Sequence, residues 1–586
     1  ALDDDPRSPR YIETLPRRGY RVIEPPEPLL EDREGMPRAE TGTSRPPGKS
    51  GRAPRLRQAG AWVTVAVAAL LVVAGWLVTN RETAREPPVA DPPLAENGIV
   101  VLPFVNLSDD PELEYFSDGL SEELMHRLAS VEALAVVART SAFAFKGTNM
   151  DVRDIGRALG VSYVLEGSVR SLDDRIRVGA QLIDVRNGFH LFSRVYERPL
   201  SDLFAIQEHV ALEVGAALEP RVPALQEGLQ RPATESADFP AYQAYLQGRY
   251  YLSRRTAKDL EQAREFFERS LHLEPDRSRT HSALAAVYAF MPYYVQTQPL
   301  SELGTRARFH AEAAIRLDEE NAEAHSIMGM VQMTFGRDWA RAQKSFARAL
   351  ELSAGDAEIL NLYGDYYYVV GDYVSAEQME SAAAGLDPLS AVHQLELGLV
   401  YDFSGQYDRA LQQARLAIAL NEELPNAWWQ LCRSYIHAGH PDLAEAELRN
   451  NASKLGRSYV ARVSALLAAE RGDSATLLSI AEDEERQFLD AGGSATIVAY
   501  HFALAGEDAK AAAYVRRAIE SNDAILVSPM YFFLPEDWGN LSSLQQALEQ
   551  AGLAELYDLR RRHIDAGVGR VPFVHGERWN VLRNRS

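Results

Sequence analysis

The segment NLYGDYYYVVGDYVSAEQMESAAAGLDP, residues 361–388, carries the pattern that decides most of the fold. Four positions of this segment are repeated further along the chain at intervals of 34 residues, with the same or a similarly small residue each time. The series are Gly364, Gly398 and Cys432; Tyr367, Tyr401 and Tyr435; Gly371, Gly405 and Gly439; and Ala376, Ala410 and Ala444. Sequence self-similarity at a period of 20–50 residues is typical of arrays in which each repeat buries its apolar face on its neighbours. We therefore predict stacked pairs of helices.

This spacing resembles the tetratricopeptide repeat, in which small residues stand where two paired helices touch. The same phase extends outward through Gly248, Phe267, Gly329, Phe346, Gly472 and Gly506. We expect about eight repeats over residues 240–525, a capping helix pair and tail over 526–586, and a concave groove that binds a peptide or helix. Tyr366 and Tyr368 flank the packed Tyr367 and are the candidates for contact with such a partner.

Residues 98–220 predict an α/β domain. GIVVLPF, residues 98–104, is a short apolar run typical of a buried strand. Leu120, Leu124 and Leu128 recur at helical spacing, and we expect Glu122 and Glu123 to face outward. The order βαβαβββα predicts a mixed sheet with helices packed on it.

The same region offers only a weak candidate for an anion site. Ser108, Asp109 and Asp110 are expected on loops, and so are Arg139 and Lys146, whose charges suit an anion. Loop capping and ordinary surface charge are the favoured alternative. Glycine-rich phosphate loops, HExxH and a nucleophile elbow are not found. We therefore expect no catalytic residue, no metal ligand and no cofactor.

Three motifs in this region, LPFVNLSDDPELEYFSDGLSEEL, ARTSAFAFKG and LEGSVR, resemble the TolB-like domain found fused to regulators and repeat proteins. The resemblance covers about 120 residues. It implies a fold and a role in assembly or sensing rather than a reaction.

A membrane span is predicted at residues 58–80, where no residue is charged and AWVTVAVAALLVVAGWLVT forms the centre. At about 1.5 Å per residue such a helix is about 35 Å long, enough to cross a hydrocarbon core of about 30 Å. Between Gly35 and Arg57 six cations stand against one acid, Glu40, whereas the far flank is balanced. The positive-inside rule then places the N-terminus in the cytoplasm and residues after about 80 outside. Residues 26–57 and 81–97 read as proline-rich linkers.

The N-terminal residues predict a β-hairpin. The β-formers of RYIETLPRRGYRVI, residues 10–23, flank a turn at Pro16–Gly19. With the preceding DDPRSP, this stretch resembles the closing wing of OmpR/PhoB-type winged-helix domains. The resemblance implies DNA contact by Arg10, Tyr11, Thr14, Arg17, Arg18, Gly19 and Tyr20. The helix-turn-helix of that family is missing, so we expect residues 1–25 to be the end of a truncated domain.

Composition sets further limits. The net charge is −22, yet the first 57 residues carry 12 basic and 10 acidic side chains, so the excess of acids lies after the predicted span. An acidic outer region argues against nucleic acid as its partner. The single cysteine, Cys432, excludes an internal disulfide and reads as a core residue.

The whole is similar to CadC/ToxR-type membrane-integrated transcriptional regulators. That resemblance implies promoter DNA as a cytoplasmic partner, a single pass through a bacterial inner membrane, and a protein or peptide bound by the periplasmic TolB-like and repeat domains. A homodimer is compatible with this architecture. The alternative is an inner-membrane tetratricopeptide scaffold without DNA binding. An enzyme is not expected.

Overall fold

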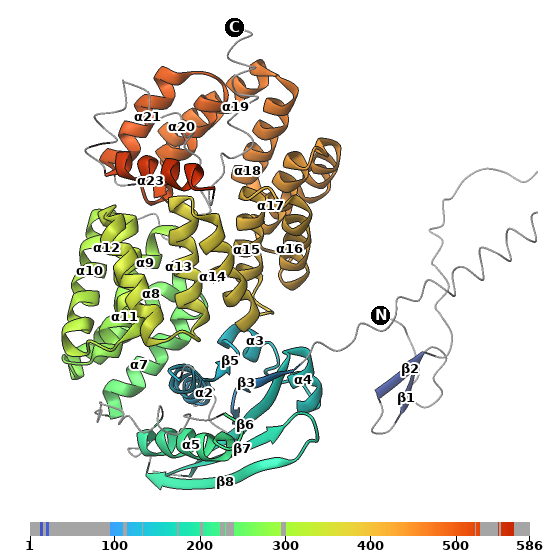
Figure 1. The fold of residues 1–586 in the computed structure, drawn as a ribbon, viewed down its shortest axis with the longest axis vertical. Helices are drawn as coiled ribbons and strands as arrows, with labels where there is room; N and C mark the ends of the chain where they lie inside the picture. Colours follow the sequence, from blue (N-terminus) through green and yellow to red (C-terminus); the bar gives the residue numbers. More distant parts are fainter. Residues whose placement is uncertain are drawn as a thin grey trace, which may run out of the picture. The chain divides into compact units, whose positions relative to one another are not determined.

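The computed structural model describes two short strands, residues 12–15 and 19–22, and then residues 94–567 with several gaps (Figure 1). The gaps are 109–113, 132, 173–174, 200–202, 223–238 apart from 229, 295–299, 522 and 528–551 apart from 549. Internal contacts divide the chain into residues 1–90 and 91–586. Among the described residues, no helix combines the length and apolarity needed to cross a membrane. The run 58–80 and both predicted linkers lie outside them, apart from the last four residues of the second linker.

The first unit contains the predicted hairpin. Strands β1 (Ile12–Leu15) and β2 (Gly19–Val22) pair antiparallel, with Thr14 opposite Tyr20 and Leu15 opposite Gly19. The remaining candidate DNA contacts, Arg10, Tyr11, Arg17 and Arg18, lie outside the described residues.

The second unit begins with a mixed sheet. Its strands are β3 (Ala95–Val101), β4 (Val105–Asn106), β5 (Ala135–Val136), β6 (Val161–Leu172), β7 (Arg175–Asp184) and β8 (His190–Pro199). They are ordered β5-β3-β6-β7-β8, and β4 pairs with β6. Pairs among β3, β4, β5 and β6 are parallel, whereas β6-β7-β8 is an antiparallel meander. The predicted mixed sheet is confirmed.

Four described helices accompany the sheet: α2 (Glu114–Ala129), α3 (Arg139–Phe143), α4 (Val152–Ala158) and α5 (Leu203–Leu218). Helices α2 and α5 contact strands of the sheet. Buried and exposed side chains alternate along β7, which α5 contacts. Ile176, Val178, Ala180 and Leu182 are buried, whereas Arg175 before them and Arg177 between the first two are exposed. Successive side chains of a strand point to opposite faces, so this alternation separates a covered face from an open one.

Helix pairs follow the sheet domain, and the structure describes eight of them. They are α7 (Phe239–Leu252) with α8 (Ala257–Leu273), α9 (Ser278–Tyr294) with α10 (Leu300–Leu317), α11 (Ala322–Val331) with α12 (Trp339–Leu352), α13 (Ala357–Val370) with α14 (Tyr373–Leu386), α15 (Ala391–Phe403) with α16 (Tyr407–Leu420), α17 (Pro425–His437) with the first part of α18 (Pro441–Arg471), the second part of α18 with α19 (Ser474–Ala491), and α20 (Ala495–Leu504) with α21 (Asp508–Glu520). Helix α18 is two helices joined at a kink, because Asn451 and Gly456 are not helical.

The predicted roles of the small residues are confirmed. A Cβ added to Gly329 would lie 2.9 Å from ring atoms of Phe346 on the paired helix, and Cys432 is wholly buried. Gly371 ends α13 with a φ of +82°, a left-handed conformation that favours glycine. The 34-residue series therefore marks close helix contacts and the turns between paired helices.

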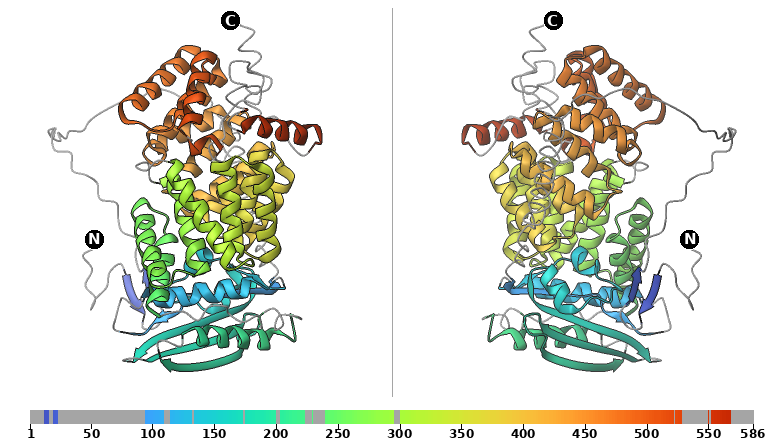
Figure 2. Two further views of the ribbon diagram at one scale, coloured as in Figure 1. Left: turned by 90° about the vertical axis from the view of Figure 1, so that its left-hand side faces the viewer. Right: turned by 90° about the vertical axis from the view of Figure 1, so that its right-hand side faces the viewer.

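The C-terminal helix α23 (Leu553–Asp565) is the described part of the predicted cap. It contacts α13 in the middle of the array (Figures 1 and 2, red beside yellow). Arg560 donates to the carbonyl of Val369 at 2.8 Å and to the hydroxyl of Tyr373 at 3.1 Å. The indole of Trp339 donates to the carbonyl of Gly552 at 2.9 Å. The chain thus returns to the third and fourth repeats after the eighth.

Candidate protein-interaction site

Helix α2 lies between the sheet and the first helices of the repeats (Figure 1). Leu120, Leu124 and Leu128 are wholly buried in the core that α2 shares with the sheet. On another side of the helix, a Cβ added to Gly119 would lie 2.7 Å from Leu246 Cδ2 on α7. One hydrophobic cluster runs from the sheet through α2 into the first repeats. The repeat array therefore already holds a helix from elsewhere in the chain.

The acidic residues of α2 make charged contacts with the repeats. Glu123 forms an ion pair with Arg279 at the start of α9 and accepts a hydrogen bond from the Tyr245 hydroxyl at 3.2 Å. Glu122 forms an ion pair with Arg139, and its Oε2 lies 3.9 Å from Nε of Arg249 on α7. Both acids are more than 90% buried. The expectation that they face outward is wrong, because the repeats cover the polar side of this helix.

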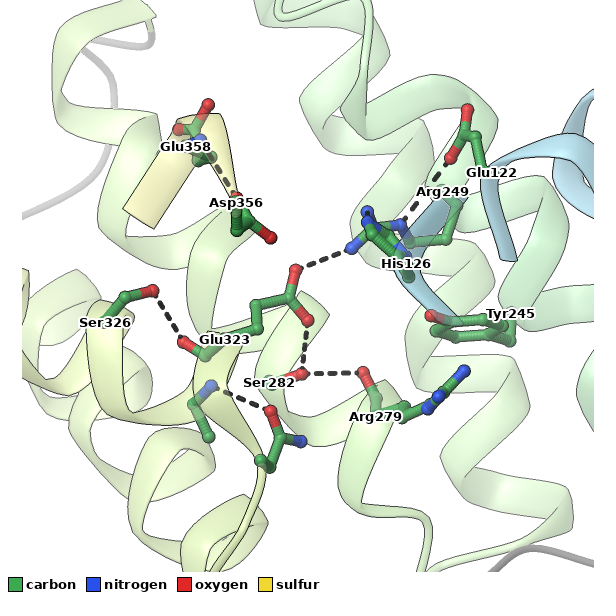
Figure 3. Close-up of polar contacts among 12 residues, drawn as sticks. Glu122, His126, Tyr245, Arg249, Arg279, Ser282, Glu323, Ser326, Asp356 and Glu358 are labelled. Carbon is green, nitrogen blue, oxygen red and sulfur yellow. Dashed lines mark hydrogen bonds and ion pairs between the residues drawn. The ribbon is translucent and has the colours of Figure 1, made fainter. Parts of the chain in front are cut away.

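The contacts continue across three repeats. Nη1 of Arg249 lies 2.6 Å from Oε1 of Glu323, at the start of α11, and the Ser282 hydroxyl of α9 donates to Oε2 of the same carboxylate at 2.6 Å (Figure 3). Nη2 of Arg249 lies 3.4 Å from Nε2 of His126 on α2. We call this set the α2 seam: Glu122, Glu123, His126, Tyr245, Arg249, Arg279, Ser282 and Glu323.

The charges around the α2 seam favour the ionised forms of its carboxylates. Burial acts to raise the pKa of Glu123, but Arg279, His126 and Arg249 outweigh it and leave that pKa below its usual value. Burial likewise opposes ionisation of Glu323, yet Arg249 and the Ser282 hydroxyl lower its pKa overall. Opposite charges a few ångströms apart favour the ionised forms of both partners. The seam is thus suited to holding a helix of matched charge.

A second contact fixes the other end of the sheet domain on the array. The backbone N–H and hydroxyl of Ser141 in α3 donate to Oδ1 of Asp387 at 2.7 and 2.5 Å. The N–H of Leu389 in turn donates to the Ser141 hydroxyl at 2.8 Å, and Ala138 N–H donates to Leu386 O at 2.8 Å. These contacts join α3 to the end of α14, so the domain reaches from the first repeat to the fourth.

The candidate anion site is not supported. Arg139 is paired with Glu122, and Nζ of Lys146 lies 2.6 Å from both Asp118 and Glu114, so neighbouring carboxylates neutralise both cations. The Ser108 hydroxyl accepts from the N–H of Ser171 at 2.8 Å, which agrees with the alternative of loop capping. Asp109 and Asp110 lie outside the described residues.

The two tyrosines expected to meet a partner are buried, with 3% of Tyr366 and 5% of Tyr368 exposed. The ring centroid of Tyr366 lies 5.9 Å from that of Phe346, and Tyr368 packs edge-on against Phe403 at 4.9 Å. Contact with a partner through these residues stays a prediction, and neither is accessible in this structure. The seam was missed because adjacent acids on an amphipathic helix usually face water.

A group of buried acids lies between the fourth and fifth repeats. Glu380 on α14 stands 34 residues after Phe346, so a carboxyl group takes the position that a phenylalanine has one repeat earlier. Nδ2 of Asn361 donates a hydrogen bond to its Oε2 at 3.1 Å. Burial raises the pKa of Glu380 well above its usual value, and Asp365 and Glu396 raise it further. Burial also raises the pKa of Glu396 to about 8. Among the described residues, no three His, Cys, Asp or Glu side chains are arranged to hold a metal ion.

Curated relatives match part of the chain, whereas no family model matches it. It is 36% identical over 262 residues to a protein of Rhizobium meliloti (strain 1021) named putative adenylate cyclase 3, and the match covers 44% of each chain. It is 26% identical over 196 residues to superkiller complex protein 3 of Mus musculus, covering 33% of this chain and 12% of that protein. The chain thus spans less than half the length of these relatives.

Similar solved structures include tetratricopeptide-repeat proteins. PilF of Pseudomonas aeruginosa shares 20% identity over 36% of this chain and 95% of its own, with a TM-score of 0.29. A tetratricopeptide repeat protein of Parabacteroides merdae shares 12% identity over 46% of this chain and 100% of its own, with a TM-score of 0.34. Such scores decide nothing alone, and the assignment rests on the 34-residue series and the helix pairs. The C-terminal region is a tetratricopeptide-like all-α solenoid, a fold suited to protein interaction.

Proposed function

We propose that the chain is a scaffold for protein–protein interaction, with the tetratricopeptide-like array as the part that receives a partner. The observation that carries this proposal is the docking of α2 on α7 and α9 through the α2 seam. Stacked helix pairs present an extended surface, and an amphipathic helix laid against such a surface is a recurring mode of recognition. The scaffold alternative from the sequence thus becomes the main proposal.

Site-specific photo-crosslinking tests it. Val374, Val392, Leu416 and Leu443 are exposed apolar side chains of the repeats. A benzoylphenylalanine at each position, in the full chain and in its native cell, should give discrete adducts with one partner protein from at least one of these sites. Phe189, an exposed residue of the sheet domain, is the matched control. Adducts from none of the four positions, or the same adducts from Phe189, would contradict the proposal.

A regulator of the CadC/ToxR type is a second candidate, and the hairpin β1–β2 favours it. Its two strands pair antiparallel with Thr14 opposite Tyr20, which is compatible with a wing hairpin. In this proposal a complete winged helix binds promoter DNA in the cytoplasm, residues 58–80 cross the inner membrane, and the array meets a periplasmic protein or peptide. The test is DNA binding by a chain extended upstream through about 80 codons. Tight, sequence-selective binding supports the candidate, and its absence from the extended chain would exclude it.

A further inference from the structure

The sheet has a second face that the described helices leave largely open. Helix α4 packs beside β6, where a Cβ added to Gly156 would meet the side chain of Val185. Farther along the strands, side chains on the face opposite α5 are exposed or half-buried. We call this region the open sheet face. Its members are Val105, Ser168, Arg170, Arg175, Arg177, Gly179, Val195 and Glu197.

A row of four residues crosses this face. Val105 pairs with Ser168, Ser168 with Gly179, and Gly179 with Val195, so the row runs over β4, β6, β7 and β8. The two valines at its ends are 57% and 58% exposed. A Cβ built on Gly179 would meet only the Ser168 hydroxyl, at 3.4 Å. The middle of the row therefore stands lower than its ends.

The width of the row suits one helix. Neighbouring strands lie about 4.8 Å apart, so three steps separate the outer strands by about 14 Å. An α-helix with its side chains is about 10–12 Å across. A helix running along the strands would place its apolar side over Ser168 and Gly179, with Val105 and Val195 on its flanks.

Charge identifies the kind of helix. Arg170 lies directly opposite Arg177 across β6 and β7, and like charges in this arrangement repel. Two acids share this side of the sheet: Glu197 stands opposite Arg177 and forms its ion pair with Arg175 at 3.2 Å, and Glu166 lies two residues before Ser168 on β6. Among the described residues, no ion pair is made by Arg170 or Arg177. Carboxylates on an incoming helix would relieve this repulsion and form charge-assisted hydrogen bonds.

We propose that the open sheet face docks an acidic amphipathic helix of a partner protein. Its apolar side lies on the Val105–Val195 row, and its carboxylates meet Arg170 and Arg177. This surface is separate from the α2 seam and the repeats, so it stands independently of the scaffold proposal. It gives the sheet domain a binding role of its own.

A labelled synthetic helix tests the proposal against the full chain by fluorescence anisotropy. The probe is a peptide of about five turns with leucine along one side and glutamate on its flanks, and the control peptide carries lysine in place of glutamate. The glutamate peptide should bind and the lysine peptide should not. Arg170→Glu combined with Arg177→Glu should weaken binding at least about tenfold, because charge pairs set much of the discrimination. Val105→Ser combined with Val195→Ser should weaken it as well.

Arg198→Glu is the matched control. Arg198 is exposed on β8 and directly follows Glu197, so its side chain points to the opposite face of the sheet. It should keep affinity within about twofold, and thermal melting should show that every variant stays folded. Equal binding by all variants would place the peptide elsewhere and overturn the proposal. Binding of phosphatidylglycerol vesicles without binding of the peptide would assign the arginines to a lipid surface instead. Loss of a dimer in sedimentation on mutating both arginines would assign the face to a second copy.

Discussion

Replacing Glu396 by glutamine should stabilise the fourth and fifth repeats, and increasingly so as the pH rises. Glu396 is 6% exposed, and burial raises its pKa from 4.5 to about 8. The charged groups that act on this cluster are Asp365 and Glu358 on α13 and Glu380 on α14, all acidic. Glutamine keeps the shape of the side chain and removes the need to hold a proton.

The sign and size follow from linkage. A carboxyl whose pKa is higher in the folded state binds its proton more tightly there, so its contribution to stability is complete below its unfolded pKa and is lost as the pH rises towards 8. Each pH unit in this window costs about 1.4 kcal/mol for one proton. Between pH of about 5 and about 7.5, wild type should therefore lose about 3 kcal/mol that the Glu396→Gln variant keeps.

Hydrogen exchange of the amides in α13 to α15, measured at both pH values in the full chain, reports the local opening free energy. The variant should match wild type near pH 5 and exceed it near pH 7.5. Glu482→Gln, at an exposed position on α19, is the control and should change neither. Equal protection of wild type and variant at the higher pH, or a loss at both, would refute the reasoning.

Three other outcomes are expected. Glu123→Arg should loosen the sheet domain from the repeats by about 3–5 kcal/mol, because it leaves a buried charge unpaired, and adding Arg279→Glu should restore part of the loss. Denaturant unfolding of the single and double mutants checks this, and no rescue would mean that the pair is not coupled. Gly398→Leu should cost about 1–3 kcal/mol by overpacking against Gln413 and Gln430, measured by thermal melting, and an unchanged melting point would contradict that close contact. A reporter fused near residue 100 should be active only outside the cytoplasm and one near residue 40 only inside, as the cation bias predicts; the reverse would exclude the regulator.

Periodic features were predictable from the sequence. The 34-residue series located the paired helices because each repeat must place small residues at the same contacts. Gly371 marked a turn because the residue that follows α13 has a left-handed backbone conformation, which favours glycine. The mixed sheet was also predictable, because strand and helix segments alternate in the order βαβαβββα before the last strands follow one another directly.

The candidate site depended on information that no local pattern contains. Glu122 and Glu123 look like water-facing residues of an amphipathic helix, and their partners Arg249 and Arg279 lie more than 120 residues later in the chain. Tyr366 and Tyr368 were expected to be accessible because Tyr367, which lies between them, belongs to the 34-residue series of packed tyrosines. Neighbouring repeats nevertheless bury both sides of α13. Burial by distant elements is decided by the way the units stack.

The return of α23 to α13 limits how this protein can change in length. An open solenoid gains or loses a repeat at little cost, because each unit touches only its neighbours. Here Arg560 holds Val369 across 191 residues of chain, and closing so long a loop costs about 1.5 kcal/mol more than closing one of a single repeat. A repeat added or deleted between α13 and α23 would move Arg560 away from Val369 and break this hydrogen bond. The number of repeats in this lineage should therefore be inherited as a fixed trait, with variation confined to the loops.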